Sequence, residues 1–361
     1  MSVILVGQFC QGYSTMSNSD SPQRLATLLQ QAFERRQPLL EQLARESTDC
    51  YRLFHGTSEG EPGLTVDRYG PQLIIQSFHR PLDAIELEAI VVQVNSLLGV
   101  ELQPFYHARQ TSQTSSESKQ VLEGANAASA AVCSELGVNY RTRGVHRGID
   151  PLLFLDLRAA RRWVQSNCAG LSVLNLFSYT CGLGVCAAKA GAAHVVNIDF
   201  AKSALAVGRE NATLNELAED KIQFIHSDFF PAIQQLGGQV VRFRRGRDAP
   251  PPKHYQRFEA QQFDLVFLDP PRLAKSPFGT VDLVRDYPSV FKPSLLATKP
   301  GGRLICTNNV AEVDRDAWLD QLQRSAAKAG RPIKGIELLE PEADFPSFDG
   351  KPPLKMAVLE V

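Results

Sequence analysis

The chain reads Ser172-Val-Leu-Asn-Leu-Phe-Ser-Tyr-Thr-Cys-Gly-Leu-Gly184 near its centre. A short apolar run bounded by turn residues is typical of a buried β-strand. The two glycines let the backbone approach a ligand closely, just before a helix whose N-terminus offers free N–H groups. A turn of this kind is common in α/β proteins, so by itself it predicts only the first strand and helix of a parallel sheet.

Four further apolar runs follow, separated by segments with a helical pattern. The runs are Val195–Asp199, Ile222–Ile225, Leu265–Asp269 and Leu304–Thr307, and the helical segments include 185–190 and 202–217. Parallel strands need crossover connections of this length, usually helices. Five runs joined in this way predict an α/β fold with a parallel sheet.

The region before the sheet is organised differently. Residues 21–45 repeat apolar side chains near the helical period, and Pro38 predicts a break into two helices. Two strands around the Tyr69-Gly70-Pro71 turn and a helix over Ala84–Leu98 predict a small α+β domain within residues 51–136.

A linker and a hairpin are expected between the two parts. Residues 110–131 are rich in Ser, Gln and Ala without apolar periodicity, which indicates a loop or linker. Val138–Gly144 and Leu152–Asp156 predict the two strands of a β-hairpin, followed by a helix that begins near Arg158.

Composition limits the classes of protein that this chain can belong to. It has 361 residues, 43% of them hydrophobic, with 38 basic and 39 acidic side chains. This length favours two domains, and the apolar content excludes collagen-like and largely unstructured chains. Near-neutral charge argues against a protein that coats nucleic acid, but leaves room for a local basic face.

The cysteines and the lengths of the apolar runs indicate in which compartment of the cell the protein works. Seven cysteines without a CxxC pair favour reduced thiols in a cytoplasmic protein over disulfides or a zinc site, so we expect no metal. No apolar run approaches the roughly 18 residues that a membrane-spanning helix needs. The first 15 residues differ in composition from those after Met16, so we expect them to be poorly ordered, or Met16 to be the true start.

Acidic side chains close successive runs of the predicted sheet. Because the carboxyl ends of parallel strands meet at one edge, Asp199, Asp228 and Asp269 are expected around a single ligand. An adenosine would suit them, with Asp199 on the ribose, Asp228 on the adenine amino group, and Phe200 or Phe229 against the ring. The alternative is that each Asp only caps the helix that follows it.

Two other classes of nucleotide-binding protein do not fit. The dinucleotide fingerprint Gly-x-Gly-x-x-Gly and the phosphate-binding Gly-x-x-x-x-Gly-Lys-Ser/Thr are both absent. Asp269-Pro270-Pro271 has no role in hydride transfer. Its prolines lack backbone donors, so its carbonyls and the Asp269 carboxylate form a rigid acceptor edge suited to a planar nucleobase.

These motifs, in this order, resemble the class I S-adenosylmethionine-dependent methyltransferases of bacterial 23S ribosomal RNA. The resemblance covers residues 51–361 and rests on eight positions or stretches: Glu61–Gly70, Phe154–Arg158, Asn175–Gly182, Asp199, Asn211–Asn215, Asp228–Phe230, Asp264–Pro271 and Gly301–Ile305. It implies a Rossmann-like methyltransferase sheet with a smaller N-terminal α+β domain and a linking β-hairpin. The implied parts are an extension (1–50), the small, RNA-binding domain (51–136), the hairpin (137–160) and the methyltransferase domain (161–361).

The resemblance also implies a site for S-adenosyl-L-methionine. The expected cofactor-binding residues are Phe177, Ser178, Gly182, Asp199, Phe200, Asp228, Phe229 and Asp269. Two positions depart from the family. Cys181 stands where the family usually has Gly, so the loop must differ locally if that position needs a positive φ. Leu157 replaces the usual Gln of the hairpin motif.

The methylated atom is the next question. Cytosine C5 becomes nucleophilic only after a thiolate adds to C6, and the cytosine-5 branch carries that cysteine after the fifth strand. Here Thr307 takes its place and Cys306 is one residue early, which favours a core role for this thiol. Thr307-Asn308-Asn309 instead resembles the Ser-Asn-Asn of a guanine-N7 enzyme, so guanine N7 is favoured and cytosine C5 is the alternative.

Guanine N7 needs no covalent nucleophile, because its lone pair is already in the plane of the base, and positioning carries the catalysis. The expected catalytic residues are therefore Asp269, Pro270, Asn308 and Asn309, with the alternative that the two asparagines only close a turn. Phe278 or Tyr287 would stack on a flipped base, unless they pack in the core.

The expected partner is RNA, either 23S ribosomal RNA or a precursor of the large subunit. Residues 238–258 hold six basic side chains against one Asp, and clustered cations suit phosphate contacts. The expected RNA-binding residues are Arg158, Arg272, Lys275, Arg244 and Arg245. A solvated loop without a partner is the alternative for the insertion. A non-catalytic RNA-binding assembly factor is the alternative for the whole chain.

Overall fold

The computed structural model describes residues 21–109, 130–144, 151–241 and 256–361. The first of these ranges forms a four-stranded sheet with two helices. Its elements are α1 (Ser21–Arg45), β1 (Cys50–His55), η1 (Gly56–Glu59), β2 (Leu64–Tyr69), β3 (Gln72–Ser77), α2 (Ala84–Leu98) and β4 (Gln103–Ala108). The strand order is β1-β2-β3-β4, with β3 and β4 parallel and the other pairs antiparallel.

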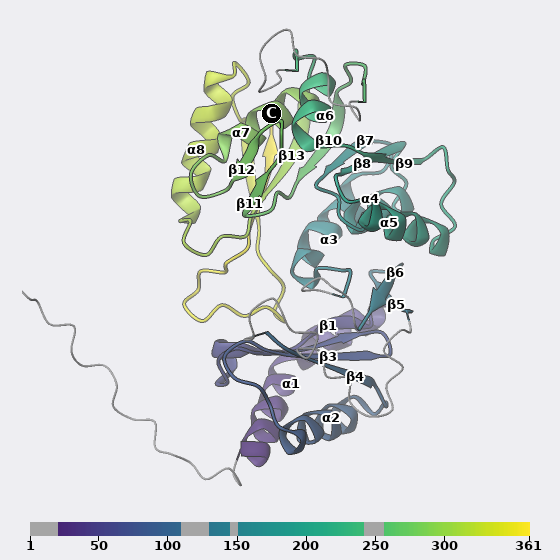
Figure 1. Cartoon of the computed structure of the whole chain (residues 1–361), viewed down its shortest axis with the longest axis vertical. Helices are drawn as coiled ribbons and strands as arrows, with labels where there is room; N and C mark the ends of the chain where they lie inside the picture. Colours follow the sequence, from purple (N-terminus) through teal and green to yellow (C-terminus); the bar gives the residue numbers. More distant parts are fainter. Residues whose placement is uncertain (1–20, 110–129, 145–150, 242–255) are drawn as a thin grey trace, which may run out of the picture.

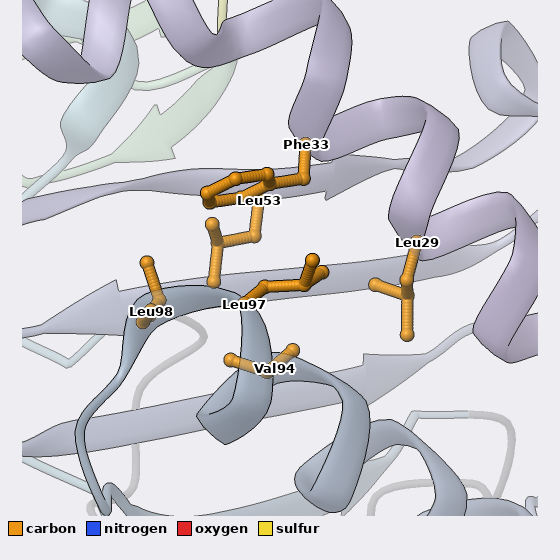
Figure 2. Close-up of a pocket in the computed structure, with 6 residues that line it drawn as sticks. All are labelled: Leu29, Phe33, Leu53, Val94, Leu97 and Leu98. Atoms are coloured by element: carbon orange, nitrogen blue, oxygen red, sulfur yellow. The ribbon is translucent and has the colours of Figure 1, made fainter.

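Both helices pack on the same face of this small sheet (Figure 1). The predicted strand–turn–strand and the helix over Ala84–Leu98 are confirmed. Figure 2 shows six apolar side chains where α1, α2 and β1 meet, around a cavity of only 10 Å³. That space is about enough for one water molecule, so this is a packing seam rather than a ligand site.

The predicted break at Pro38 is wrong. α1 is one continuous helix from Ser21 to Arg45 with Pro38 inside it. Proline removes one backbone donor from a helix. Leu29 before it and Leu43 after it are buried in the same core, so packing on the small sheet holds the helix together across that position.

The larger part is a seven-stranded sheet of order β14-β15-β13-β10-β7-β8-β9. Its strands are β7 (Ser172–Leu176), β8 (His194–Asp199), β9 (Ile222–His226), β10 (Phe263–Leu268), β13 (Thr298–Asn308), β14 (Gly335–Leu339) and β15 (Lys355–Glu360). Five neighbouring strands, from β13 to the edge strand β9, are parallel, as predicted, and β15 runs antiparallel between β13 and β14. The expected Rossmann-like sheet is confirmed.

Helices cover this sheet on both faces (Figure 1). They are α3 (Arg158–Asn167), α4 (Gly182–Lys189), α5 (Lys202–Leu214), α6 (Phe229–Leu236), α7 (Pro288–Ala297) and α8 (Arg315–Lys328), with the short turn η3 (Leu155–Leu157) before α3 and a small ribbon of β11 (Leu273–Lys275) and β12 (Thr280–Asp282). The chain reverses its direction of winding between β7 and β10, which is where open α/β sheets bind ligands.

The hairpin lies earlier in the chain than expected. β5 (Ala130–Glu135) pairs with β6 (Val138–Arg143), whereas residues 152–156 form no strand and lead into η3. Ala130 and Ala131 belong to this hairpin rather than to the linker. Alanine-rich residues lack the apolar alternation that marks a strand, so the sequence pattern does not show the first half of the hairpin.

A buried ionic cluster joins the two sheets to the hairpin. Arg158 is completely buried, and its guanidinium donates to Glu135 of β5, to Asp344 in the segment between β14 and β15, and to the backbone oxygen of Cys50 in β1. Figure 1 shows that segment reaching from the large sheet down to the small one. The prediction that Arg158 binds RNA is therefore wrong, because its donors are used inside the protein.

Candidate active site

A cavity of 630 Å³ opens beyond the carboxyl ends of β7, β8 and β10. This is the point where the strand order reverses. Its walls come from four stretches of the chain: residues 153–161, residues 175–183, residues 199–201 and residues 267–274, with Asn309 and Leu354 completing the lining. Of the predicted site residues, Phe177, Ser178, Gly182, Asp199, Phe200, Asp269, Pro270, Arg272 and Asn309 meet here.

The loop after β7 has an unusual backbone. Phe177, Tyr179 and Cys181 all have left-handed conformations, with φ of 54°, 48° and 61°. Residues other than glycine rarely adopt such angles, and they persist only where the surroundings hold them. Position 181 therefore does need a positive φ, and the chain meets this with a buried cysteine instead of a glycine.

Asp199 holds this loop in place. Its carboxylate accepts hydrogen bonds from the backbone N–H of Tyr179 (2.9 Å) and of Ala201 (2.7 Å). Burial raises the pKa of Asp199, and these backbone donors counter the rise. Asp199 thus lines the cavity and also fixes the backbone of the loop after β7. It does not cap the following helix, because the N-cap of α5 is Ala201, which has no side-chain cap hydrogen bond.

The glycines after the loop allow close packing. A Cβ on Gly184 would lie 1.9 Å from the side-chain oxygen of Asn197, which itself accepts a hydrogen bond from Asn175 at 2.9 Å. A Cβ on Gly182 would meet Leu153 at 3.1 Å. Only glycine at 184 lets α4 approach β8 so closely, so this glycine serves helix packing while Gly182 lines the cavity.

Asp228 and Phe229 do not line the cavity. Asp228 caps α6 by accepting from the backbone N–H of Phe230 at 2.9 Å, which is the alternative role foreseen for it. Phe229 is buried and stacks on Phe177 with ring centroids 4.6 Å apart. Phe229 therefore supports a residue of the wall, whereas Phe200 is 62% exposed and belongs to the wall itself.

The Asp-Pro-Pro motif follows β10, the strand beside β7, and also lines the cavity. One oxygen of Asp269 accepts a hydrogen bond from the Thr307 hydroxyl, at the end of β13. Burial raises the pKa of Asp269 to about 6, the Thr307 hydroxyl opposes the rise, and the charge of Asp156 adds to it. Pro270 and Pro271 continue the wall, so the carboxylate is held at a rigid edge of the cavity.

The two asparagines after β13 have different surroundings. Asn308 is completely buried, and its side-chain oxygen accepts from the backbone N–H of Val310 at 3.0 Å. It closes a turn and does not line the cavity, so its predicted catalytic contact is wrong. Asn309 is exposed and does line the cavity.

The residues weighed for base stacking and for covalent catalysis lie elsewhere. Cys306 and Tyr287 are completely buried in the core beneath the sheet, and Tyr287 donates to the backbone oxygen of Thr307 at 2.8 Å. Burial raises the pKa of the Cys306 thiol far above its usual range. Phe278 packs against the same core, so the structural roles foreseen for these side chains are confirmed.

The cations predicted to bind RNA differ in their exposure. Arg272 lines the cavity mouth, and its exposed side chain pairs with Glu312 at 3.1 Å. Lys275 is exposed on β11. Arg244 and Arg245 lie outside the described residues, as does most of the basic insertion.

Sequence reasoning missed one wall of the cavity. Phe154, Asp156 and Leu157 line it, and so does Tyr179. The sequence pattern of Phe154-Leu-Asp-Leu-Arg158 predicts a hairpin strand. A strand of that hairpin gives no reason to expect the Asp156 carboxylate at a ligand site. Across the described ranges there is no cluster of three or more residues able to hold a metal ion, and no helix long and apolar enough to span a membrane.

Comparison with known proteins gives consistent results. A family model described as S-adenosylmethionine-dependent methyltransferase matches residues 51–241. A protein of Aeromonas salmonicida named ribosomal RNA large subunit methyltransferase I is 28% identical over 324 residues, which covers 88% of this chain and 74% of the relative. A protein of the same name from Aliivibrio fischeri is 29% identical over 309 residues, covering 84% and 71%.

Solved structures share the fold. A methyltransferase complexed with SAH superposes with a TM-score of 0.76 at 22% identity, covering 94% of this chain and 82% of that one. A SAM-dependent methyltransferase from Streptococcus mutans gives 0.72 at 22% identity, covering 94% and 81%. At this identity the likeness establishes the fold, and it spans both the small sheet and the large one.

Proposed function

Because this chain belongs to the family of S-adenosylmethionine-dependent methyltransferases, we propose that it methylates a base of large-subunit ribosomal RNA, with guanine N7 as the acceptor atom. The relatives named for large-subunit ribosomal RNA support the class of substrate. We place the reaction in the cytoplasm, where such RNA is made and modified in bacteria. The cavity that Phe177, Asp199 and Asp269 line together argues against a non-catalytic assembly factor.

The residues of the cavity fit S-adenosylmethionine. Its 630 Å³ lies within the range of small-molecule sites. Asp199 retains acceptor capacity for ribose hydroxyls, the exposed ring of Phe200 offers a face for adenine, and the left-handed loop at 177–181 brings backbone close to the ligand. When bound, the cofactor supplies an electrophilic methyl group on a sulfonium.

The chain's own part in the reaction is to hold the acceptor atom in line with that methyl group. Asp269 and the proline carbonyls present a fixed set of acceptors to an amino N–H of the base, while Asn309 at the mouth can donate or accept. Holding two reactants in this way supplies much of the rate enhancement when the acceptor is already nucleophilic.

The positions of the thiols support a nitrogen acceptor over cytosine C5. All six cysteines within the described residues are buried, and none belongs to the lining of the cavity. Thr307 turns its hydroxyl to Asp269, at the position where a cytosine-5 enzyme needs a thiolate. This is the observation that carries the choice of atom.

The test is methylation of ribosomal RNA by the purified enzyme. Large subunits from a strain that lacks the gene are incubated with labelled S-adenosylmethionine, and the RNA is digested to nucleosides for mass spectrometry. We expect labelled 7-methylguanosine in 23S ribosomal RNA. Labelled 5-methylcytidine would reverse the choice of atom, and an unlabelled RNA despite cofactor binding would overturn the ribosomal substrate.

A further inference from the structure

The wall formed by residues 152–157 is anchored at three consecutive carbonyl oxygens. The hydrogen bonds run from the Thr180 hydroxyl to Leu152 (2.7 Å), from the Tyr69 hydroxyl to Leu153 (3.0 Å) and from the Arg161 guanidinium to Phe154 (2.8 Å). The three donors belong to the loop after β7, to the small sheet and to α3. A segment tied to three separate parts of the protein is rigid, which is what a binding site requires of its support.

Phe154 projects an aromatic face into the cavity. Its side chain is 41% exposed, although it lines the cavity and follows directly after buried residues. The Tyr179 ring lies beside it, with centroids 5.5 Å apart and planes inclined by 46°. An exposed ring held against a second ring is a platform on which a base can stack.

Asp156 presents a carboxylate to the same cavity. Within the described residues it forms no ion pair and no hydrogen bond to another side chain, although two arginines lie near. Both arginines are committed elsewhere: Arg52 binds Asp67 at 2.7 Å and Arg161 binds Glu135. Burial raises the pKa of Asp156, and the two guanidinium charges counter the rise. The hydrogen bond that it does accept comes from its own backbone N–H, so the carboxylate keeps acceptor capacity for a ligand.

We propose that Phe154 and Asp156 form the pocket for the target base, in which Phe154 stacks on the ring and the Asp156 carboxylate accepts two neighbouring N–H donors of guanine. The proposal rests on the function proposed above and adds the group that selects the base. Asp269 lines the same cavity and is close enough for the charge of Asp156 to be felt there.

The preference for guanine follows from the pattern of donors on each base. Guanine offers a ring N–H at N1 next to the amino group at N2, and both can donate to one carboxylate. Adenine and cytosine place an acceptor nitrogen beside their amino group. That nitrogen would face a carboxylate oxygen, and two acceptors repel each other. A carboxylate that forms no ion pair with any described residue and lies in a half-buried wall therefore favours guanine and rejects the other two.

The decisive probe is inosine, which is guanosine without the amino group at N2. Two short fragments of 23S ribosomal RNA are compared, one with the target guanine and one with inosine at that position. For the wild-type enzyme we expect kcat/KM to fall about 10- to 100-fold with inosine, in keeping with the loss of one well-placed hydrogen bond. An equal kcat/KM for the two RNAs overturns the proposal without any variant.

The Asp156→Asn variant then tests whether this residue reads the amino group. We expect a raised KM for the guanine RNA and a much smaller difference between guanine and inosine, with unchanged binding of S-adenosylmethionine in calorimetry. The matched control is Asp220→Asn, since Asp220 is exposed and lies outside the cavity. If Asp156→Asn keeps the full guanine-to-inosine ratio, the inference fails while methylation of guanine still stands.

The stacking role has its own variant. Phe154→Leu keeps an apolar side chain but removes the aromatic face, so we expect kcat/KM for the RNA to fall about 10-fold while cofactor affinity is unchanged. Phe348→Leu is the control, because Phe348 is 76% exposed in another loop. Equal activities for the two variants would contradict stacking on Phe154. If the wild-type enzyme methylates no guanine at all, the proposed function has failed instead.

Discussion

At the scale of single residues, Asp269 sets how the proposed reaction responds to pH. Burial raises the pKa of this carboxyl to about 6. Below that pH the group is protonated and loses acceptor capacity toward the base, so kcat/KM is expected to fall as the pH drops through 6 and to level off above it. Initial rates with saturating cofactor, measured across this range, give the profile.

A variant of Thr307 tests whether Asp269 is the group that sets the pH profile. Its hydroxyl donates to Asp269 and thereby favours the charged form, so Thr307→Val should raise the pKa of Asp269 further. The acidic limb of the profile then moves to higher pH, and kcat/KM levels off at a higher pH than in the wild-type enzyme. A limb that stays in place in this variant would mean that another group controls it.

At the scale of elements, the segment from Pro341 to Pro346 ties the large sheet to the small one. Asp344 is completely buried, and its carboxylate accepts from Arg158 at 3.1 Å and from the backbone N–H of Arg52 at 3.1 Å. Phe345 lies under the Arg52 guanidinium, 4.6 Å from it, and Ser58 donates to Pro346 at 2.9 Å. The contacts reach β1 and η1 from a loop late in the chain.

Removing the Asp344 carboxylate should cost much stability. Asp344→Ala leaves Arg158 buried with an excess of positive charge, and breaking a buried pair in this way lowers the free energy of unfolding by about 3–5 kcal/mol. Urea denaturation measures the change. The control is Glu340→Ala, which breaks the exposed pair between Arg315 and Glu340 and should cost about 1 kcal/mol or less. Equal losses in both variants would show that the segment stabilises the fold no more than a surface pair does.

The same cluster shows what the sequence could and could not predict. Strands buried on both faces read as continuous apolar runs, so the sequence predicts β7, β8, β9, β10 and the end of β13. Arg158 resembles an RNA contact because its charge is visible in the sequence, whereas its partners Glu135, Glu342 and Asp344 are far along the chain and are brought together only by the fold. Likewise Asp228 and Asp199 end similar strands, and only their surroundings separate a helix cap from a cavity wall.

At the scale of the whole molecule, the cofactor should stabilise the fold. A ligand that binds only the native state adds about 2.7 kcal/mol to the free energy of unfolding at a hundred times its Kd. We expect S-adenosylmethionine to raise Tm in a thermal melt, and Asp199→Ala to abolish the rise, because that variant frees the loop at 177–181. Asp220→Asn should keep it. A rise of the same size in Asp199→Ala would remove this residue from the cofactor site.

The buried cluster around Arg158 also has a consequence for how the protein is made. A ribosome releases the chain from its N-terminus, and domains generally fold in that order. Asp344 follows Arg158 by 186 residues, so the arginine emerges long before this partner does. Until then, the small sheet lacks its contacts with the segment before β15, although the wall at 152–157 can already bond to Thr180, Tyr69 and Arg161. The cavity beside this wall is closed late in translation, because Leu354, the last residue of its lining, follows the segment that carries Asp344.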